Sequence, residues 1–162
     1  MAAQLDPSQE DQQADLSSDR TCNMTSAVTG LNHLTLAVTD QQRSLDFYVD
    51  VLEMTPHARW TGGAYLSAGE LWLCLSLCPD VKTLHSAADY THIALTIRST
   101  ELSEWRQRFA DEGVRLWKEN SSEGGSIYFL DPDGHQLELH AGDLQSRLNS
   151  IRLEPYEDLE LF

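Results

Sequence analysis

The sequence has few basic residues and no long apolar run. Its 162 residues hold 11 lysines and arginines against 26 aspartates and glutamates, which gives a formal net charge of -15. This excess of acid argues against a nucleic-acid or anionic-membrane partner, because both present negative charge. No stretch is long and apolar enough to span a bilayer, and the first residues lack the basic start and apolar run of a secretory signal.

Cysteines are also scarce. Cys22, Cys74 and Cys78 form no CxxC pair, and three cysteines do not make a disulfide framework. We therefore expect a protein of the reducing cytoplasm.

The length and the 41% of hydrophobic residues suit one well-packed domain or two small halves sharing a sheet. The first 23 residues carry five acids, one base and hardly any large apolar side chain. We expect residues 1–28 to be a disordered acidic extension. Met24 stands just before the first patterned residues and is an alternative start of translation.

The patterned part of the chain repeats one order of elements. Alternating or apolar runs predict strands at 31–38, 54–60, 64–68 and 71–77, with a helix capped by Asp40 after the first strand. After an aperiodic linker, the order returns with strands at 90–97, 115–119, 126–131 and 136–141 and a helix at 101–112. We predict an α+β domain at 29–155, built from βαβββ units at 30–78 and 90–141, a linker at 79–89, a helix at 143–151 and a tail at 156–162.

The repeat pairs two histidines. His33 and His92 occupy the same place on equivalent strands, each on the face without the leucines. One histidine alone is more often a satisfied or exposed side chain. Two at matching positions of a repeat predict a shared concave surface.

A carboxylate stands on the corresponding face of another strand. In residues 136–140, QLELH, the leucines share one face, and Gln136, Glu138 and His140 share the other. Such a strand is either half exposed or lines a polar cavity. With the two histidines, Glu138 predicts a catalytic divalent metal site, and nitrogen and oxygen donors suit manganese, iron, nickel, cobalt or zinc. His140 is an alternative third ligand.

Several motifs make the sequence resemble a known family. The repeated units and the two-histidine, one-glutamate set are similar to the vicinal oxygen chelate superfamily. GLNHLTLAV (30–38), DYTH (89–92) and the set WKEN, SEG, YFLDPDGH and LE-H within 117–140 resemble the FosA class of fosfomycin resistance proteins. The resemblance implies two βαβββ units forming a curved mixed sheet around a metal site, in a domain-swapped homodimer.

The resemblance also implies an activity, cofactors and site residues. The activity is transfer of glutathione to the oxirane carbon of fosfomycin, dependent on Mn(II) and K⁺. The implied metal ligands are His33 from one subunit and His92 and Glu138 from the other. The remaining implied roles are substrate binding by Thr35, Trp72, Tyr90, Lys118, Ser122, Tyr128 and Arg147, catalysis by Thr35 and Tyr65, and potassium binding by Asn120, Ser122, Gly124 and Ser126.

Several alternative interpretations also fit the sequence. Ser121 stands where close relatives often have arginine, and Glu70 is either a surface hairpin residue or the general base of an epoxide hydrolase. Other functions are compatible with the vicinal oxygen chelate fold. They are a transferase that uses bacillithiol or cysteine, a metal-free drug-sequestering protein, and a glyoxalase- or dioxygenase-like enzyme. Tyr65 and Trp72 are core residues in the simplest interpretation. Lys118 and Arg147 favour the phosphonate enzyme, because an acidic chain places scarce bases near the predicted metal strand.

Overall fold

The computed structural model describes residues 28–80, 82, 90–120 and 124–162, of which Leu31–Phe162 form one compact unit. Most of the predicted extension 1–28 and of the predicted linker 79–89 lies outside the described residues, as do Ser121 and Ser122. The predicted domain boundaries stay predictions.

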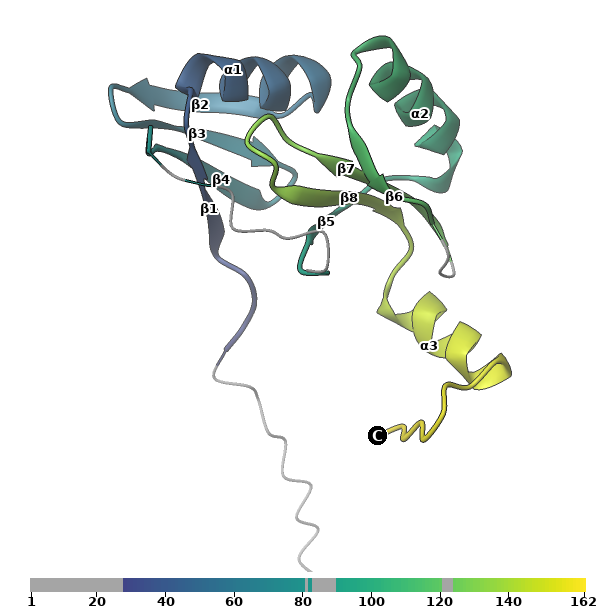
Figure 1. The fold of residues 1–162 in the computed structure, drawn as a ribbon. Helices are drawn as coiled ribbons and strands as arrows, with labels where there is room; N and C mark the ends of the chain where they lie inside the picture. The colour runs from purple at the N-terminus through teal and green to yellow at the C-terminus, as the bar shows by residue number, and fades with distance from the viewer. Residues whose placement is uncertain (1–27, 81, 83–89, 121–123) are drawn as a thin grey trace, which may run out of the picture. The chain divides into compact units, whose positions relative to one another are not determined.

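The chain runs through the same order of elements twice (Figure 1). The first half has β1 (His33–Val38), α1 (Gln41–Asp46) continuing into the short η1 (Phe47–Val51), β2 (Thr55–Trp60), β3 (Gly63–Ala68) and β4 (Leu71–Leu77). The second half has β5 (Ile93–Thr96), η2 (Ser99–Glu101), α2 (Leu102–Asp111), β6 (Leu116–Lys118), β7 (Gly125–Leu130) and β8 (Gln136–Ala141). The closing helix is α3 (Leu144–Leu153).

Each half forms one four-stranded mixed sheet. The strand orders are β1-β4-β3-β2 and β5-β8-β7-β6. β1 runs parallel to β4 and β5 runs parallel to β8, and the other neighbouring pairs are antiparallel. The registers also match, because Thr35 of β1 faces Cys74 of β4 as Ala94 of β5 faces Glu138 of β8. The predicted α+β fold of paired βαβββ units is confirmed.

The element ends have local causes. The Asp40 carboxylate accepts a hydrogen bond from the Arg43 backbone N–H at 3.1 Å, which confirms the predicted N-cap of α1. Asp143 caps α3 in the same way through Ser146.

The strand predicted at 90–97 is shorter than expected. Its parallel pairing with β8 begins where Ile93 meets Leu137. Tyr90 and His92 therefore lie in the segment just before β5.

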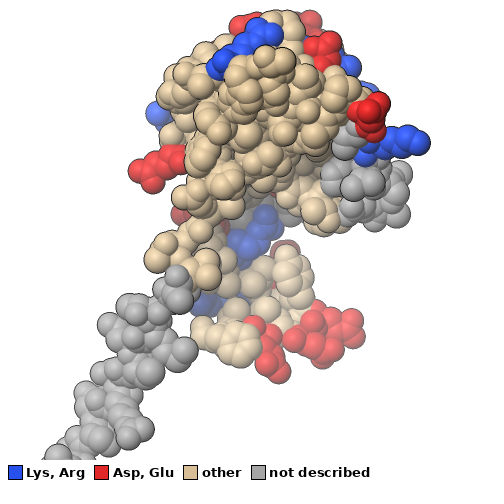
Figure 2. Space-filling model, turned by 90° about the vertical axis from the view of Figure 1, so that its left-hand side faces the viewer, with Lys and Arg blue, Asp and Glu red and all other residues tan. Residues whose placement is uncertain are grey.

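The core joins both sheets to the helices. Tyr48 of η1 and Phe109 of α2 are almost fully buried against apolar strand residues that include Leu66, Leu75 and Phe129. On β8 both faces are covered, since residues 136–139 are all buried. The half-exposed alternative for this strand is therefore wrong. On the face shown in Figure 2, charged side chains lie mainly at the margins and uncharged ones fill the middle.

The β7–β8 turn fastens the two halves together. Asp133 accepts hydrogen bonds from the Thr39 backbone N–H at 3.2 Å, from Arg43 at 2.7 Å and from the Ser44 hydroxyl at 3.2 Å. His135 Nε2 lies 2.8 Å from the Ala37 carbonyl oxygen and donates to it. The end of β1 and the start of β8 are thus held at one junction.

Candidate metal and anion site

The central contact of the site joins His92 to Glu138. His92 Nε2 lies 2.8 Å from Glu138 Oε2, and only 5% of Glu138 is exposed. The His92 Nδ1 atom lies 2.8 Å from the Tyr90 carbonyl oxygen. A carbonyl only accepts hydrogen bonds, so Nδ1 carries a ring proton, and in the neutral ring Nε2 turns its lone pair toward the carboxylate.

This arrangement fits a divalent cation. Two acceptors 2.8 Å apart repel each other unless a second ring proton or a cation lies between them. A buried carboxylate and an imidazole nitrogen, with the other ring nitrogen fixed by a backbone carbonyl, form the donor set and the supporting contact typical of metal sites. His92 and Glu138 would be the residues that hold the ion.

His140 stands on the other side of the carboxylate. Its Nδ1 lies 3.3 Å from Glu138 Oε1 and 2.9 Å from the Ser126 hydroxyl. It lies beside the carboxylate, but His92, Glu138 and His140 do not group as a three-ligand metal site within the described residues.

His33 is not part of this cluster in the single chain. It is exposed at the start of β1, where its Nδ1 atom lies 2.8 Å from Asn32 Oδ1 and its ring lies 4.6 Å from that of Trp72. Within residues 28–80, 82, 90–120 and 124–162, no three histidine, cysteine, aspartate or glutamate side chains meet as a metal site. The chain alone brings together two of the three predicted ligands.

A positively charged side chain, that of Lys118, lies on the second sheet in the same cross-strand row of residues as Glu138. Glu138 faces Tyr128 across β7 and β8, and Tyr128 faces Lys118 across β6 and β7. Lys118 Nζ donates to the Tyr90 hydroxyl at 2.9 Å. This hydrogen bond lowers the pKa of Tyr90 below its ordinary value and raises the pKa of Lys118. Lys118 is therefore a positively charged side chain beside the carboxylate–imidazole pair.

Trp117 completes the wall around His92. Its ring lies 6.0 Å from that of His92, 5.3 Å from that of Tyr128 and 6.1 Å from that of Tyr90. Its indole N–H donates to the Leu137 carbonyl at 3.3 Å. Sequence reasoning assigned it no role, although it precedes the predicted phosphonate lysine in the WKEN motif. A β-bulge within β6 interrupts the alternation of side chains between the two faces of the strand, so the faces of Trp117 and Lys118 do not follow from their order in the sequence.

A second group of predicted residues lies on the first sheet. Thr35, Tyr65 and Trp72 are all exposed. The Tyr65 ring lies 5.2 Å from that of Trp72 and 4.7 Å from that of Trp60, so these aromatic side chains form a continuous row that reaches His33. The interpretation of Tyr65 and Trp72 as core residues is therefore wrong within the single chain.

The remaining predicted residues are placed only in part. Asn120 Nδ2 donates to the Gly124 carbonyl at 2.8 Å, and Ser126 is buried beside His140. Ser122 lies outside the described residues, and Arg147 is half-buried on α3. Their roles in potassium and substrate binding stay predictions.

A cavity of about 700 Å³ separates the two sheet edges near His92. Its lining comes from the start of β1, the β3–β4 turn and β5, and includes Leu34, Glu70, Leu71, His92, Ile93 and Leu95. Glu70 is exposed at the turn, and it shares this cavity with His92.

Among the described helices, none combines the length and apolar character needed to cross a membrane.

Known proteins share this fold and sequence. Residues 30–139 match the Glyoxalase/Bleomycin resistance protein/Dioxygenase superfamily. The glutathione transferase FosA of Serratia marcescens is 50% identical over 127 residues, which cover 78% of this chain and 90% of that protein. The metallothiol transferase FosB of Staphylococcus saprophyticus is 37% identical over 78% of this chain and 86% of its own length.

Solved structures of fosfomycin resistance proteins have the same fold as this chain. The fosfomycin resistance protein FosX of Listeria monocytogenes superposes with a TM-score of 0.68 at 32% identity, over 76% of this chain and 98% of that chain. A glutamate-to-glutamine mutant of the same protein, complexed with Mn(II) and 1S,2S-dihydroxypropylphosphonic acid, superposes with the same TM-score of 0.68 at 31% identity, over 75% of this chain and 98% of that chain.

Proposed function

This chain belongs to the Glyoxalase/Bleomycin resistance protein/Dioxygenase superfamily and, within it, to the fosfomycin resistance enzymes; from that premise we propose that it transfers glutathione to the oxirane carbon of fosfomycin, using Mn(II) and K⁺. The 50% identity to a glutathione transferase supports glutathione over other thiols. The observation that carries the proposal is the buried Glu138 carboxylate 2.8 Å from His92 Nε2, next to a lysine in an otherwise acidic chain.

His92 and Glu138 of one chain would hold the metal, with His33 as the third ligand. When bound, it supplies Lewis-acid stabilisation of the charge that develops on the epoxide oxygen. Tyr90 keeps His92 in the tautomer that offers Nε2, because its carbonyl accepts the Nδ1 proton. Burial of Glu138 keeps its carboxylate away from competing water.

Lys118 binds and orients the phosphonate. Its ammonium group is fixed by the Tyr90 hydroxyl at 2.9 Å and lies 4.1 Å from the centre of the Tyr90 ring and 5.0 Å from that of Tyr128. A doubly charged substrate is attracted to such a fixed cation. Thr35, Tyr128, Ser122 and Arg147 are the further proposed contacts of the phosphonate, and Asn120, Ser122, Gly124 and Ser126 supply oxygens for the potassium ion.

The thiol approaches from the exposed aromatic row of the first sheet. Tyr65 is held between Trp60 and Trp72, with its hydroxyl as the proposed partner of the glutathione sulfur. Trp72 lies against His33, so the thiol side and the metal side of the site meet at this histidine. The thiol releases its proton to solvent, its sulfur forms a C–S bond as the epoxide C–O bond breaks, and the resulting alkoxide takes up a proton from solvent.

A homodimer completes the site. His33 stands on β1 and His92 just before β5, and each of these strands is the edge of its sheet. The cavity between the edges is lined by Leu34, Ile93 and Leu95, which are apolar residues that a second chain would cover. We propose that His33 of one subunit joins His92 and Glu138 of the other, in the cytoplasm.

Product analysis tests the reaction. The purified chain loaded with Mn(II) and K⁺ is incubated with fosfomycin, with and without glutathione, and products are identified by mass spectrometry. We expect a glutathione adduct only when the thiol is present. Adducts with bacillithiol or cysteine at a higher rate would reassign the thiol, and a chain that binds no divalent ion but retains the drug would be a sequestering protein.

Hydration of the epoxide is the second candidate. It is favoured by Glu70, which lines the same cavity as His92 and could activate a water molecule. A diol formed without thiol, and lost in Glu70→Gln, would establish this activity in place of the transferase.

A further inference from the structure

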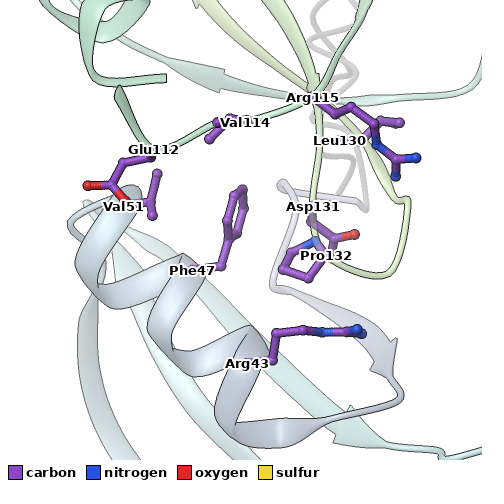
Figure 3. Close-up of a pocket in the computed structure, with 10 residues that line it drawn as sticks. Arg43, Phe47, Val51, Glu112, Val114, Arg115, Leu130, Asp131 and Pro132 are labelled. Carbon is purple, nitrogen blue, oxygen red and sulfur yellow. The ribbon is translucent and has the colours of Figure 1, made fainter. Parts of the chain in front are cut away.

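A groove that is lined by none of the proposed metal ligands lies between the helix of the first half and the connection from α2 to β6 (Figure 3). It has a volume of about 330 Å³. Its apolar floor is half-buried and comes from η1, the segment before β6, the end of β7 and the β7–β8 turn: Phe47, Val51, Val114, Leu130 and Pro132. In the close-up the Phe47 ring points into the groove, with Val51 and Val114 on one side and Pro132 on the other.

Two arginines lie on one side of this groove. Arg43 and Arg115 stand on the side of Pro132, and Glu112 stands on the side of Val51. The Arg115 side chain is exposed and has no ion pair or hydrogen bond with any residue that the structure describes. Arg43 contacts Asp133 but keeps 48% of its side chain exposed.

The acids near the arginines are already engaged. Asp131 is 2% exposed and accepts from the Tyr48 hydroxyl at 2.9 Å and the His135 backbone N–H at 2.7 Å. Asp133 is held by Thr39 and Arg43. The charge that this side of the groove presents to an incoming group is therefore positive, above an apolar floor.

The C-terminal segment 154–162, EPYEDLELF, has the complementary character. It alternates apolar and acidic residues, with four acids and no base. Tyr156 is 61% exposed, Leu161 is 45% exposed and Phe162 is fully exposed. This segment lies beyond residue 139, where the match to the superfamily ends.

We propose that the groove is a docking site for segment 154–162 of a second copy of the chain. Leu161 and Phe162 would cover the apolar floor at Phe47, and Glu160 or Asp158 would face the two arginines. A groove of about 330 Å³ holds an aromatic side chain together with a neighbouring aliphatic one.

Topology favours a second copy over the chain's own segment. The groove lies at the end of β7 and before the start of β8, whereas α3 and the segment follow the far end of β8 at Ala141. A six-residue strand spans about 20 Å, and α3 continues away from that end. The contact is heterologous, joining one patch to a different one, and leaves the edges of β1 and β5 free for the proposed dimer.

A photo-cross-linking experiment tests this proposal on the full chain. Phe162 is replaced by p-benzoylphenylalanine, and ¹⁵N-labelled and unlabelled chains are mixed before irradiation. We expect cross-links from position 162 to residues 47–51 or 112–115, and we expect them between labelled and unlabelled chains. Cross-links only within one chain, only to other surfaces, or none at all would overturn the proposal.

Charge variants sharpen the result. Arg115→Glu should lower the cross-link yield about fivefold, as should Asp158→Asn combined with Glu160→Gln, because each removes one partner of the exposed ion pairs. Arg98→Glu is the matched control, since Arg98 is also exposed but pairs with Glu101 away from the groove, and its yield should stay unchanged. An unchanged yield in both test variants would also overturn the proposal.

Discussion

Asp133, in the turn between β7 and β8, accepts a hydrogen bond from the backbone N–H of Thr39 at the end of β1, 94 residues earlier. The same carboxylate contacts Arg43 and Ser44 and is almost completely buried. One side chain thus connects the two halves of the repeat, and neither half can rotate against the other without breaking its hydrogen bonds.

Removing this carboxylate should destabilise the fold. We expect Asp133→Ala to lower the free energy of unfolding by about 2–4 kcal/mol, because the half-buried Thr39 and the buried Ser44 lose their acceptor at once and Arg43 loses its ion pair. Urea denaturation followed by circular dichroism measures the change. The control is Asp46→Ala, an exposed helix residue that accepts a hydrogen bond from the Gln42 side chain, for which we expect a change below about 0.5 kcal/mol. Equal effects of the two substitutions would contradict the role assigned to Asp133.

Asp131 should make stability depend on pH. Burial raises its pKa, although hydrogen bonds from the His135 backbone and from Tyr48 act in the opposite direction. A carboxyl group with a raised pKa in the folded state contributes stability that is complete below its unfolded pKa of about 4 and is lost as pH rises through the folded pKa. We therefore expect the wild type to lose stability relative to Asp131→Asn over that window. A stability difference between the two proteins that is constant with pH would contradict the raised pKa.

Substituting the proposed metal ligands should abolish metal binding and leave the fold intact. We expect His92→Ala and Glu138→Ala to lower turnover more than about 100-fold and to lose bound Mn(II), because each removes a proposed ligand. Circular dichroism and electron paramagnetic resonance of Mn(II) measure fold and metal together. His57→Ala is the control, since His57 is exposed on β2 beside Ser67, and it should keep both metal and activity. Full activity with stoichiometric metal in either ligand variant would refute the assignment.

Lys118 should affect substrate binding without affecting metal content. A charge-assisted hydrogen bond to the phosphonate contributes roughly 1.5–3 kcal/mol, so Lys118→Met should lower kcat/KM by about 10–100-fold. Lys82 is the other lysine of the sequence and is exposed. Lys82→Met should leave kcat/KM unchanged. A loss of metal in Lys118→Met would mean that the lysine acts on the metal site and not on the anion.

Thr35 offers the same separation on the first sheet. Thr35→Ala should lower turnover while Mn(II) stays bound, since its hydroxyl is proposed to contact substrate and not metal. Steady-state kinetics and metal analysis of the same preparation measure the two effects. Thr55→Ala, on exposed β2, is the matched control. Retained turnover in Thr35→Ala would remove this residue from the site.

Sharing of ligands between subunits can be tested by complementation. His33→Ala and Glu138→Ala chains are each inactive in the proposed site, but a mixed dimer holds one site with all three ligands. Random exchange makes half of the dimers mixed, so activity should recover to about a quarter of wild type. Size-exclusion chromatography verifies the dimer. No recovery after verified exchange would place all three ligands in one chain.

Sequence patterns were sufficient to predict the repeated order of elements, the N-cap at Asp40, and the association of His92 with Glu138. Apolar periodicity and capping side chains act within a few residues, so they can be read without knowing the fold. The resemblance carried by the YFLDPDGH and DYTH motifs led to the same family that the relatives and the fold show.

How these parts meet could be learned only from the folded chain. There β8 is buried on both faces, Trp117 stands against His92, and Asp133 connects the halves. His33 is also separate from the His92–Glu138 pair within the described part of one chain. Alternation along a strand fixes which side chains share a face, but whether that face meets water, a helix or a second chain depends on residues distant in sequence.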